Sequence, residues 1–276
     1  MCGIAGFAIA PQSPVIADKL DALQCMAESL ILGIKDRGSD ATGIAIMVDK
    51  KVKVYKKPIK AEDFVKRTFF QKFIKENIVP GIKGVLLHTR AQTKGSPSDN
   101  RNNHPIIFGT VVGVHNGIIM NDDYFMRKIG YLKNGEVDSQ AIFAGLHKHV
   151  SEEKHPGGMS MSDAMRKVDT ALSGSMAIAA YSTLVDDNIL LFKNRSPLSF
   201  REDTKNAMLV FASSKEVIAQ AYEQSGLESD NSIDDVMDGC IIRADICNST
   251  VKAIRSWAGT YSNYGSNGQE EYCHYI

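Results

Sequence analysis

Apolar residues follow two patterns along the chain, one typical of strands and one typical of helices. Residues 3–10 form a short, almost wholly apolar run typical of a buried strand. From Val15 onward, apolar residues recur every three or four positions, which predicts one face of a helix. Polar residues at 36–40 end that helix. Strands follow at 42–48 and 52–55, joined by a charged turn, and the lysine-rich stretch around them is typical of a solvated edge hairpin.

The rest of the chain continues this alternation. Further helices are predicted at 62–78, at 137–149, after Ser160 and from residue 213. Further strands are predicted at 84–87, 106–114, 176–184, 188–193, 208–211 and 239–254. Residues 91–104 are polar and rich in Gly, Pro, Ser and Asn, which predicts a long loop of the kind that often carries function. Because no regular strand–helix–strand repeat is present, the pattern favours an α+β protein with stacked sheets.

Composition supports one soluble domain followed by a tail. The chain has 276 residues, 43% of them hydrophobic and 23% charged, which is ordinary for a globular protein that buries its own core. At residue 256 the composition shifts to Tyr, Ser, Asn, Gly and Gln. We therefore expect a domain over residues 1–255 and a peripheral polar and aromatic tail over 256–276.

Charge and cysteine usage narrow the functional classes. Lys and Arg total 32 and Asp and Glu total 32, so nothing in the net charge indicates a nucleic-acid or membrane partner. The start of the chain has no secretory pattern, and the five cysteines form no CxxC or Cys/His spacing, so we expect a cytoplasmic protein with free thiols and no metal. His147, His149 and His155 lie close in sequence, where a solvated helix end is favoured over a metal site.

Cys2 is the first candidate for chemistry. If Met1 is removed, the α-amine of Cys2 has an ordinary pKa of about 8 and its thiol one of about 8.5. One residue would then supply both a nucleophile and a general base. Alone, this signal is weak, because a Cys after Met is usually accidental.

Four further residues in three segments offer groups that acyl transfer needs. Asn116 and Gly117, at a predicted strand end, offer a side-chain N–H and a backbone N–H that suit a tetrahedral oxyanion, although an Asn-Gly hairpin turn is the alternative. Arg90, at another strand end, can clamp a carboxylate or be a structural arginine. Asp138 can hold an ammonium group or cap the helix that follows it.

Together these segments resemble the class II glutamine amidotransferases, the family with an N-terminal cysteine nucleophile. The resemblance runs through residues 2–215 in the right order. It is carried by Met-Cys-Gly-Ile-Ala-Gly-Phe at the start, Arg37-Gly38-Ser39-Asp40-Ala41-Thr42-Gly43, His88-Thr89-Arg90, Asn103-His104-Pro105, His115-Asn116-Gly117-Ile118-Ile119, Val137-Asp138-Ser139-Gln140, Ser196-Pro197-Leu198 and Phe211-Ala212-Ser213. Each motif is weak alone, but their order is hard to obtain by chance.

The resemblance implies a fold and a mechanism. The family fold is a four-layer α/β/β/α sandwich of mainly antiparallel sheets. By resemblance, Cys2 attacks the side-chain amide of glutamine, and Asn116 and Gly117 stabilise the oxyanion. Arg90 binds the α-carboxylate of glutamine and Asp138 its α-ammonium group. Ammonia leaves, and water hydrolyses the thioester to glutamate, without any cofactor.

The loop after Arg90 resembles the family's glutamine loop, which closes over the substrate. The resemblance implies that Thr93 and Gly95 in this loop are further substrate contacts. Two positions depart from the glucosamine-6-phosphate synthase branch of the family. Ala91-Gln92 follows where that branch has a Trp, and Lys94 replaces a His. Gating by an aromatic side chain is therefore not expected.

The acceptor of the ammonia is the remaining question. About sixty residues follow Ser214, too few for a synthase domain of the kinds that the family carries. We therefore expect a separate synthase or ligase chain as partner, with the aromatic tail and the glutamine loop as candidate contacts. The alternatives are a stand-alone amidase of glutamine or another γ-glutamyl amide, and a non-catalytic regulatory subunit with the same fold.

Overall fold

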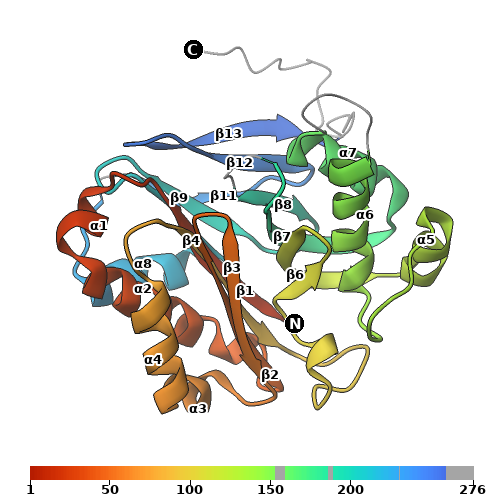
Figure 1. The fold of residues 1–276 in the computed structure, drawn as a ribbon, viewed down its shortest axis with the longest axis horizontal. Coiled ribbons are helices and arrows are strands. Elements are labelled where there is room, and N and C mark those ends of the chain that lie inside the picture. Colours follow the sequence, from red (N-terminus) through yellow and green to blue (C-terminus); the bar gives the residue numbers. More distant parts are fainter. Residues whose placement is uncertain (153–158, 186–188, 230, 259–276) are drawn as a thin grey trace, which may run out of the picture.

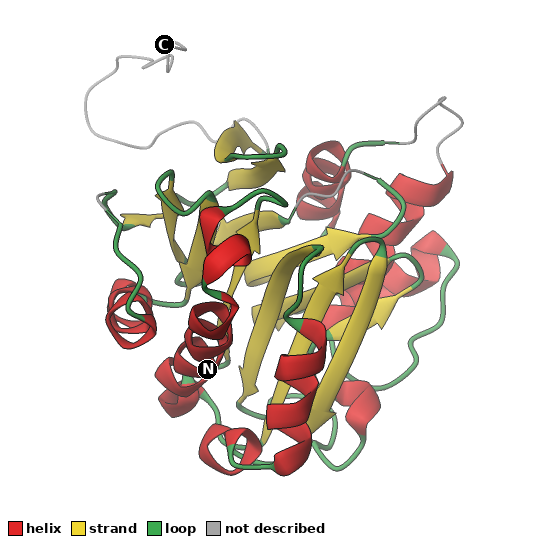
Figure 2. Cartoon of the chain, turned by 60° about the vertical axis from the view of Figure 1, so that its left-hand side comes forward, coloured by secondary structure: helices red, strands yellow, loops and turns green. Residues whose placement is uncertain are grey.

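The computed structural model describes residues 1–152, 159–185, 189–229 and 231–258. Two antiparallel sheets are stacked face to face, and helices cover the outer face of each (Figure 1). Figure 2 shows the strands of both sheets enclosed between these helices. The predicted α+β class and its four-layer α/β/β/α arrangement are confirmed.

The first sheet has the strand order β11-β9-β10-β1-β4-β2-β3. Its strands are β1 (Gly3–Ile9), β2 (Ala41–Val48), β3 (Lys51–Lys57), β4 (Ile82–Arg90), β9 (Ser199–Asp203), β10 (Met208–Ala212) and β11 (Asp234–Asp235). Its outer layer comprises α1 (Pro14–Asp18), α2 (Leu20–Gly33), α3 (Ala61–Val65), α4 (Thr68–Asn77) and α8 (Lys215–Ser225). The lysine-rich β3 is an edge strand, as predicted for the solvated hairpin.

The second sheet has the strand order β13-β12-β8-β7-β6-β5. Its strands are β5 (Ile106–Phe108), β6 (Val111–Ile119), β7 (Gly174–Ser182), β8 (Leu190–Asn194), β12 (Cys240–Ile246) and β13 (Val251–Trp257). Its outer layer comprises α5 (Asp122–Ile129), α6 (Ser139–Glu152) and α7 (Met161–Ala171). Two short 3-10 turns, η1 (Lys35–Arg37) and η2 (Asn100–Asn102), complete the described elements.

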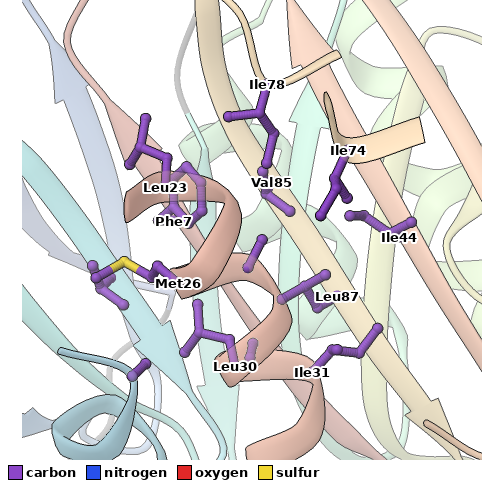
Figure 3. Packing of buried hydrophobic residues seen from close by; sticks show 14 of the residues in the cluster. Phe7, Leu23, Met26, Leu30, Ile31, Ile44, Ile74, Ile78, Val85 and Leu87 are labelled. Carbon is purple, nitrogen blue, oxygen red and sulfur yellow. The ribbon is translucent and has the colours of Figure 1, made fainter. Parts of the chain in front are cut away.

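Three apolar clusters fill the spaces between the four layers. Figure 3 shows the first of them, in which Leu23, Met26 and Leu30 of α2 share one cluster with side chains of the first sheet such as Phe7, Val85 and Leu87. A second cluster lies between α6 and the second sheet. The third fills the gap between the sheets, and Ile4, Leu86 and Val114 belong to it. Because side chains alternate along a strand, the even-numbered residues of β1, β4 and β6 face this gap.

Several predicted elements differ from those observed. The predicted helix beginning at Val15 is broken at Lys19, whose φ of −138° is not helical. The helix predicted at 62–78 is likewise two helices, α3 and α4, separated at Arg67. Apolar spacing continues across both breaks, so periodicity alone does not reveal them. Helix α5 and strand β9 were not predicted, because their sequences are polar.

The strand predicted at 106–114 is in fact a hairpin. Strands β5 and β6 flank a turn at Gly109, which has a left-handed φ of 55°. Strand β6 then runs on to Ile119, so the Asn-Gly pair lies inside a strand rather than in a turn. The region 239–254 does contain two strands, but β13 continues to Trp257, so the tail boundary expected at 256 falls within it. Residues 259–276 lie outside the described part.

Other expectations concern thiols, metals and membranes. Cys2, Cys25, Cys240 and Cys247 are free thiols, and Cys273 lies outside the described residues, as does His155. Within the described ranges, no three or more His, Cys, Asp or Glu side chains gather as a metal site would require. None of the helices that the structure describes is long and apolar enough to cross a bilayer.

Candidate active site

Strand alternation brings three of the predicted site residues into the gap between the sheets. In the pairing of β1 with β4, Gly3 lies opposite Thr89, so the next positions outward are Cys2 and Arg90. Both are even-numbered and therefore face the gap. Asn116 of β6 faces the same gap from the second sheet. The sequence separates these residues widely, and the stacking of the sheets brings them to one end of the sandwich.

The backbone of Cys2 is held by a side-chain hydrogen bond, and its thiol makes one long contact with a backbone carbonyl. The Cys2 carbonyl accepts a hydrogen bond from Arg37 Nε at 3.0 Å, and Cys2 Sγ lies 3.5 Å from the carbonyl oxygen of Ala91. Burial raises the pKa of the Cys2 thiol, against the opposing effects of the Ala91 contact, the N-terminal ammonium and Arg90. A thiol with a raised pKa is protonated at neutral pH and needs a base before it can attack.

The segment from Arg37 to Gly43 positions both Cys2 and the start of the glutamine loop. The backbone N–H of Asp40 donates to the Arg90 carbonyl at 2.9 Å, and its carboxylate accepts from the Gln92 N–H at 2.6 Å. Gly38 packs so tightly that a Cβ there would lie 2.2 Å from the Arg90 carbonyl carbon. This motif is therefore a brace that joins the nucleophile to the loop.

Arg90 is buried and already holds the glutamine loop. Its Nη1 donates to Asn103 Oδ1 at 2.8 Å. Its Nη2 donates to the carbonyls of Lys94 at 2.7 Å and Gly95 at 2.6 Å. Because a guanidinium has five N–H groups, Nε and one hydrogen on Nη1 remain for a ligand. The sequence motif containing Asn103 gave no role for this residue, and the structure shows that it orients Arg90.

Asn116 and Gly117 present two donors near the end of β6. Asn116 Nδ2 is buried and has no hydrogen-bond partner among the described residues. A buried amide donor left without a partner is costly, which suggests that a ligand supplies the acceptor. Gly117 has φ 148°, and a Cβ there would lie 2.0 Å from the Ser175 carbonyl oxygen, so only glycine fits.

The backbone N–H of Gly117 points to an open sheet edge. Strand β5 pairs only with residues 111 to 113 of β6, so β6 is uncovered on that side beyond them. N–H directions alternate along a strand, so Gly117 and Ile119 point the same way. The Ile119 N–H donates to Asp138 Oδ2 at 2.6 Å, which places Asp138 on that open side.

Asp138 is buried immediately before α6. Its backbone carbonyl accepts from the Ala141 N–H at 3.0 Å, and the residue is 4% exposed. The carboxylate interacts electrostatically with the Cys2 thiol and with the Arg90 guanidinium. A negative charge is therefore available close to the nucleophile, as an ammonium-binding role requires.

The two loop residues are placed differently. Gly95 has a left-handed φ of 77°, and its carbonyl is one of those held by Arg90. Thr93 is exposed. The structure therefore brings Cys2, Arg90 and Asn116 to one end of the gap, and leaves Thr93 on the outside of the loop.

An ion network fixes the far end of the loop. Lys94 Nζ donates to Asp122 Oδ2 at 2.7 Å, and Lys133 Nζ donates to the same oxygen at 2.6 Å. The Asp122 side chain is buried. Sequence reasoning missed this network because Lys94 and Asp122 are 28 residues apart and belong to no local pattern.

Three histidines lie next to the site. The rings of His88 and His104 stack at 4.2 Å, and His88 Nε2 donates to the His115 carbonyl at 3.1 Å. Burial lowers the pKa of His88 to about 3 and lowers those of His104 and His115. These rings are neutral at physiological pH and cannot supply charge to the site.

The chain is similar to known proteins over most of its length. No protein-family model matches it. It is 27% identical over 276 residues to the glutamine–fructose-6-phosphate aminotransferase [isomerizing] of Bacillus subtilis (strain 168), an alignment covering 96% of this chain and 42% of that protein. It is 31% identical over 201 residues to the protein of the same name from Pyrococcus horikoshii, covering 72% of this chain and 30% of that protein. The chain thus spans less than half the length of these curated relatives.

The fold has a counterpart among solved structures. The structure of the glutamine phosphoribosylpyrophosphate amidotransferase of B. subtilis, complexed with ADP and GMP, matches 94% of this chain and 50% of its own. The TM-score is 0.66 and the sequence identity 17%. At that identity the likeness establishes the shared fold.

Proposed function

This chain is a class II glutamine amidotransferase domain, and from that premise we propose that it hydrolyses the side-chain amide of glutamine through a thioester on Cys2. The observation that carries the proposal is the buried Asn116 amide, which has no hydrogen-bond partner among the described residues and faces the gap that also receives Cys2 and Arg90. A donor held ready in a buried site is what a developing oxyanion requires.

Acylation begins with a proton transfer. After loss of Met1, the α-amine of Cys2 accepts the thiol proton, directly or through water, and Sγ attacks the amide carbon of glutamine. The negative charge that develops on oxygen is received by Asn116 Nδ2 and the Gly117 N–H. The carbon–nitrogen bond then breaks, the amine returns its proton to the leaving nitrogen, and ammonia departs.

Deacylation uses the same groups in reverse. Water gives a proton to the α-amine and attacks the thioester carbonyl, and the oxyanion again forms between Asn116 and Gly117. The carbon–sulfur bond breaks, Sγ recovers the proton, and glutamate is released. The raised pKa of the Cys2 thiol fits this scheme, because a thiol that is protonated at rest depends on the adjacent amine.

Glutamine is held by its two charged ends. Its α-carboxylate meets the remaining N–H groups of Arg90, and its α-ammonium meets the Asp138 carboxylate. Both protein groups are buried, so these contacts gain strength from the exclusion of water. Thr93 and Gly95 are further substrate contacts in this proposal, and Thr93 would reach the substrate only after a movement of the loop.

The first experiment tests the nucleophile. Glutamate release is measured for chains that begin at Cys2 and for chains that retain Met1, each verified by intact mass. We expect turnover only from the first, because the nitrogen of Cys2 is an amide in the second and cannot act as a base. Full turnover by the chain that retains Met1 would disprove the amine mechanism.

The second half of the proposal concerns the ammonia. The relatives are named as aminotransferases that use glutamine and fructose 6-phosphate. For this chain we propose a separate synthase or ligase as acceptor, with residues 1–255 as the glutaminase domain, the tail as a candidate contact, and a cytoplasmic site of action. Stand-alone amidase action and a non-catalytic regulatory role are the alternatives.

Hydrolysis with and without the candidate partner separates these alternatives. A synthase that receives ammonia should raise glutamine turnover several-fold when its own acceptor is present. Removing residues 259–276 should cancel this stimulation and preserve basal turnover. Basal turnover unchanged by any candidate synthase would favour the stand-alone amidase, and absence of turnover from the chain beginning at Cys2 would favour the regulatory subunit.

A further inference from the structure

A second cavity lies where the edge strands of the two sheets come together. It has a volume of about 730 Å³ and is lined by residues of β3, β5, η2 and the start of α4. We call it the edge pocket. This volume is that of a small-molecule site. The edge pocket contains none of the residues assigned above to glutamine hydrolysis, so the proposed function leaves it unexplained.

The edge pocket is strongly cationic. Lys56, Lys57, Arg67 and Arg101 line it, and none of the described lining residues is acidic. Arg101 pairs with Asp99 at 2.7 Å. Within the described residues, the side chains of Lys57 and Arg67 have no hydrogen-bonding or ion-pair partner.

Lys56 adds a further positive charge beside the pocket. Its Nζ donates to the carbonyls of Asn103 at 2.6 Å and Pro105 at 2.9 Å, and both acceptors are uncharged. Burial lowers the pKa of Lys56 to about 8, against the opposing effect of Asp99. An anion near Lys56 would favour its charged form.

The pocket also has an apolar wall. Phe69 and Ile107 line it, and each is 57% exposed. Tyr55 lies behind Phe69, with ring centroids 4.6 Å apart, and is buried. The Tyr55 hydroxyl has no hydrogen-bond partner among the described residues. Exposed apolar side chains on a pocket wall are a feature that a bound ligand would cover.

We propose that the edge pocket binds an organic phosphate that carries a flat apolar group. The phosphate lies between Lys57 and Arg67, since a dianion matches cations that have no ion-pair partner among the described residues. The flat group packs against Phe69 and Ile107. The site is separate from glutamine hydrolysis and does not depend on it.

The two halves of the ligand can be tested separately by calorimetry on the full chain. Adenosine 5′-monophosphate is the probe, with adenosine and inorganic phosphate as its two halves. We expect saturable binding of one nucleotide per chain, and at least tenfold weaker binding of either half. Equal affinity for inorganic phosphate, equal affinity for adenosine, or no saturable binding of the nucleotide would each overturn the proposal.

Substitutions of lining residues then test where in the edge pocket the ligand binds. Arg67→Ala and Lys57→Ala should each weaken nucleotide binding about tenfold, as expected for the loss of one charge-assisted contact. Phe69→Ala should weaken nucleotide binding without changing the affinity for inorganic phosphate. Lys53→Ala is the matched control, because Lys53 is an exposed lysine on the same strand and does not line the pocket. If Lys53→Ala weakened binding as much as Arg67→Ala, the attraction would be a general surface charge effect and the proposal would fail.

Discussion

The candidate active site and the edge pocket use charge in opposite ways. In the active site, Arg90 and Asp138 are buried, and each makes specific hydrogen bonds that fix its position. In the edge pocket, Lys57 and Arg67 are exposed and their side chains are unpaired within the described structure. Buried groups act in a low dielectric and are already oriented, whereas exposed charges are screened by water and salt. Single substitutions should therefore have effects in the first region at least as large as those in the second, and binding in the second should depend more strongly on salt.

The strongest test of this difference is removal of the nucleophile. Cys2→Ala should reduce glutamate release to background, because no other group in the site can form the thioester. The folded state should survive, since Cys2 precedes the first strand. Cys25→Ala is the matched control and should retain full turnover. Residual turnover of Cys2→Ala near that of the control would refute the assignment.

Loss of the Asn116 amide donor should have the second-largest effect on turnover. Asn116→Ala should lower kcat by about a hundredfold, because an oxyanion donor acts mainly on the transition state. KM should change little. Steady-state kinetics of glutamine hydrolysis measure both constants. A rise in KM at constant kcat would assign Asn116 to ground-state binding instead.

Burial also affects the pH dependence of folding stability, through the histidines next to the active site. Burial lowers the pKa of His88 to about 3, so the unfolded chain, where its pKa is near 6.5, binds the proton more readily. Stability from this residue is complete above pH 6.5 and is lost as the pH falls toward 3. By pH 5 the loss should reach about 2 kcal/mol, or thirtyfold in the folding equilibrium.

The variant His88→Gln isolates this contribution, because glutamine can still donate to the His115 carbonyl but does not titrate. Urea unfolding at pH 7.5 and pH 5 should show a smaller difference in free energy of unfolding for the variant than for the original chain, by about 2 kcal/mol. An equal difference for both proteins would show that His88 titrates normally.

The charge that holds the substrate ammonium should have an intermediate effect. Asp138→Asn keeps an oxygen that can accept from the Ile119 N–H but removes the negative charge. We expect KM for glutamine to rise by roughly tenfold or more, as for loss of one charge-assisted contact, with kcat nearly retained. A fall in kcat at constant KM would mean that Asp138 serves the reaction rather than binding.

The smallest expected effect is that of salt concentration on ligand binding in the two regions. Raising the ionic strength from well below to well above the physiological value should weaken nucleotide binding in the edge pocket several-fold, because the screening length shortens past about 8 Å. KM for glutamine should change less than twofold, because its binding groups are buried. Equal salt dependence in the two regions would remove the distinction between them.

Sequence motifs found the active site because its chemistry is concentrated in short segments. Cys2, Arg90, Asn116 and Asp138 each stand in a recognisable local context, and alternation along strands explains how they meet. The supporting groups were harder to find. Lys94 and Asp122 pair through space, and nothing near either residue indicates the other.

The edge pocket could not be predicted from the sequence, for a related reason. Its residues come from several segments, and Phe69 lies in the region 62–78 that was predicted to be a single helix. The break at Arg67 starts a new helix there, which leaves Phe69 exposed beside β3. Lys51, Lys53 and Lys57 of β3 are exposed, as predicted for a solvated hairpin, whereas Lys56 is partly buried. The charge of Lys57 acquires a binding role only when β5 and η2 complete the walls of the pocket.

The shortness of β5 determines where this fold can accept new residues. Pro105 stands directly before β5 and has no backbone N–H, so the ladder along β6 stops there. An insertion before Ile106 that supplied further extended residues would lengthen the ladder toward Gly117 and occupy its N–H. An insertion in the turn at Gly109, at the opposite end of β5, would leave that edge open. The hairpin should therefore tolerate insertions in the turn at Gly109. Insertions just before Ile106 should not be tolerated.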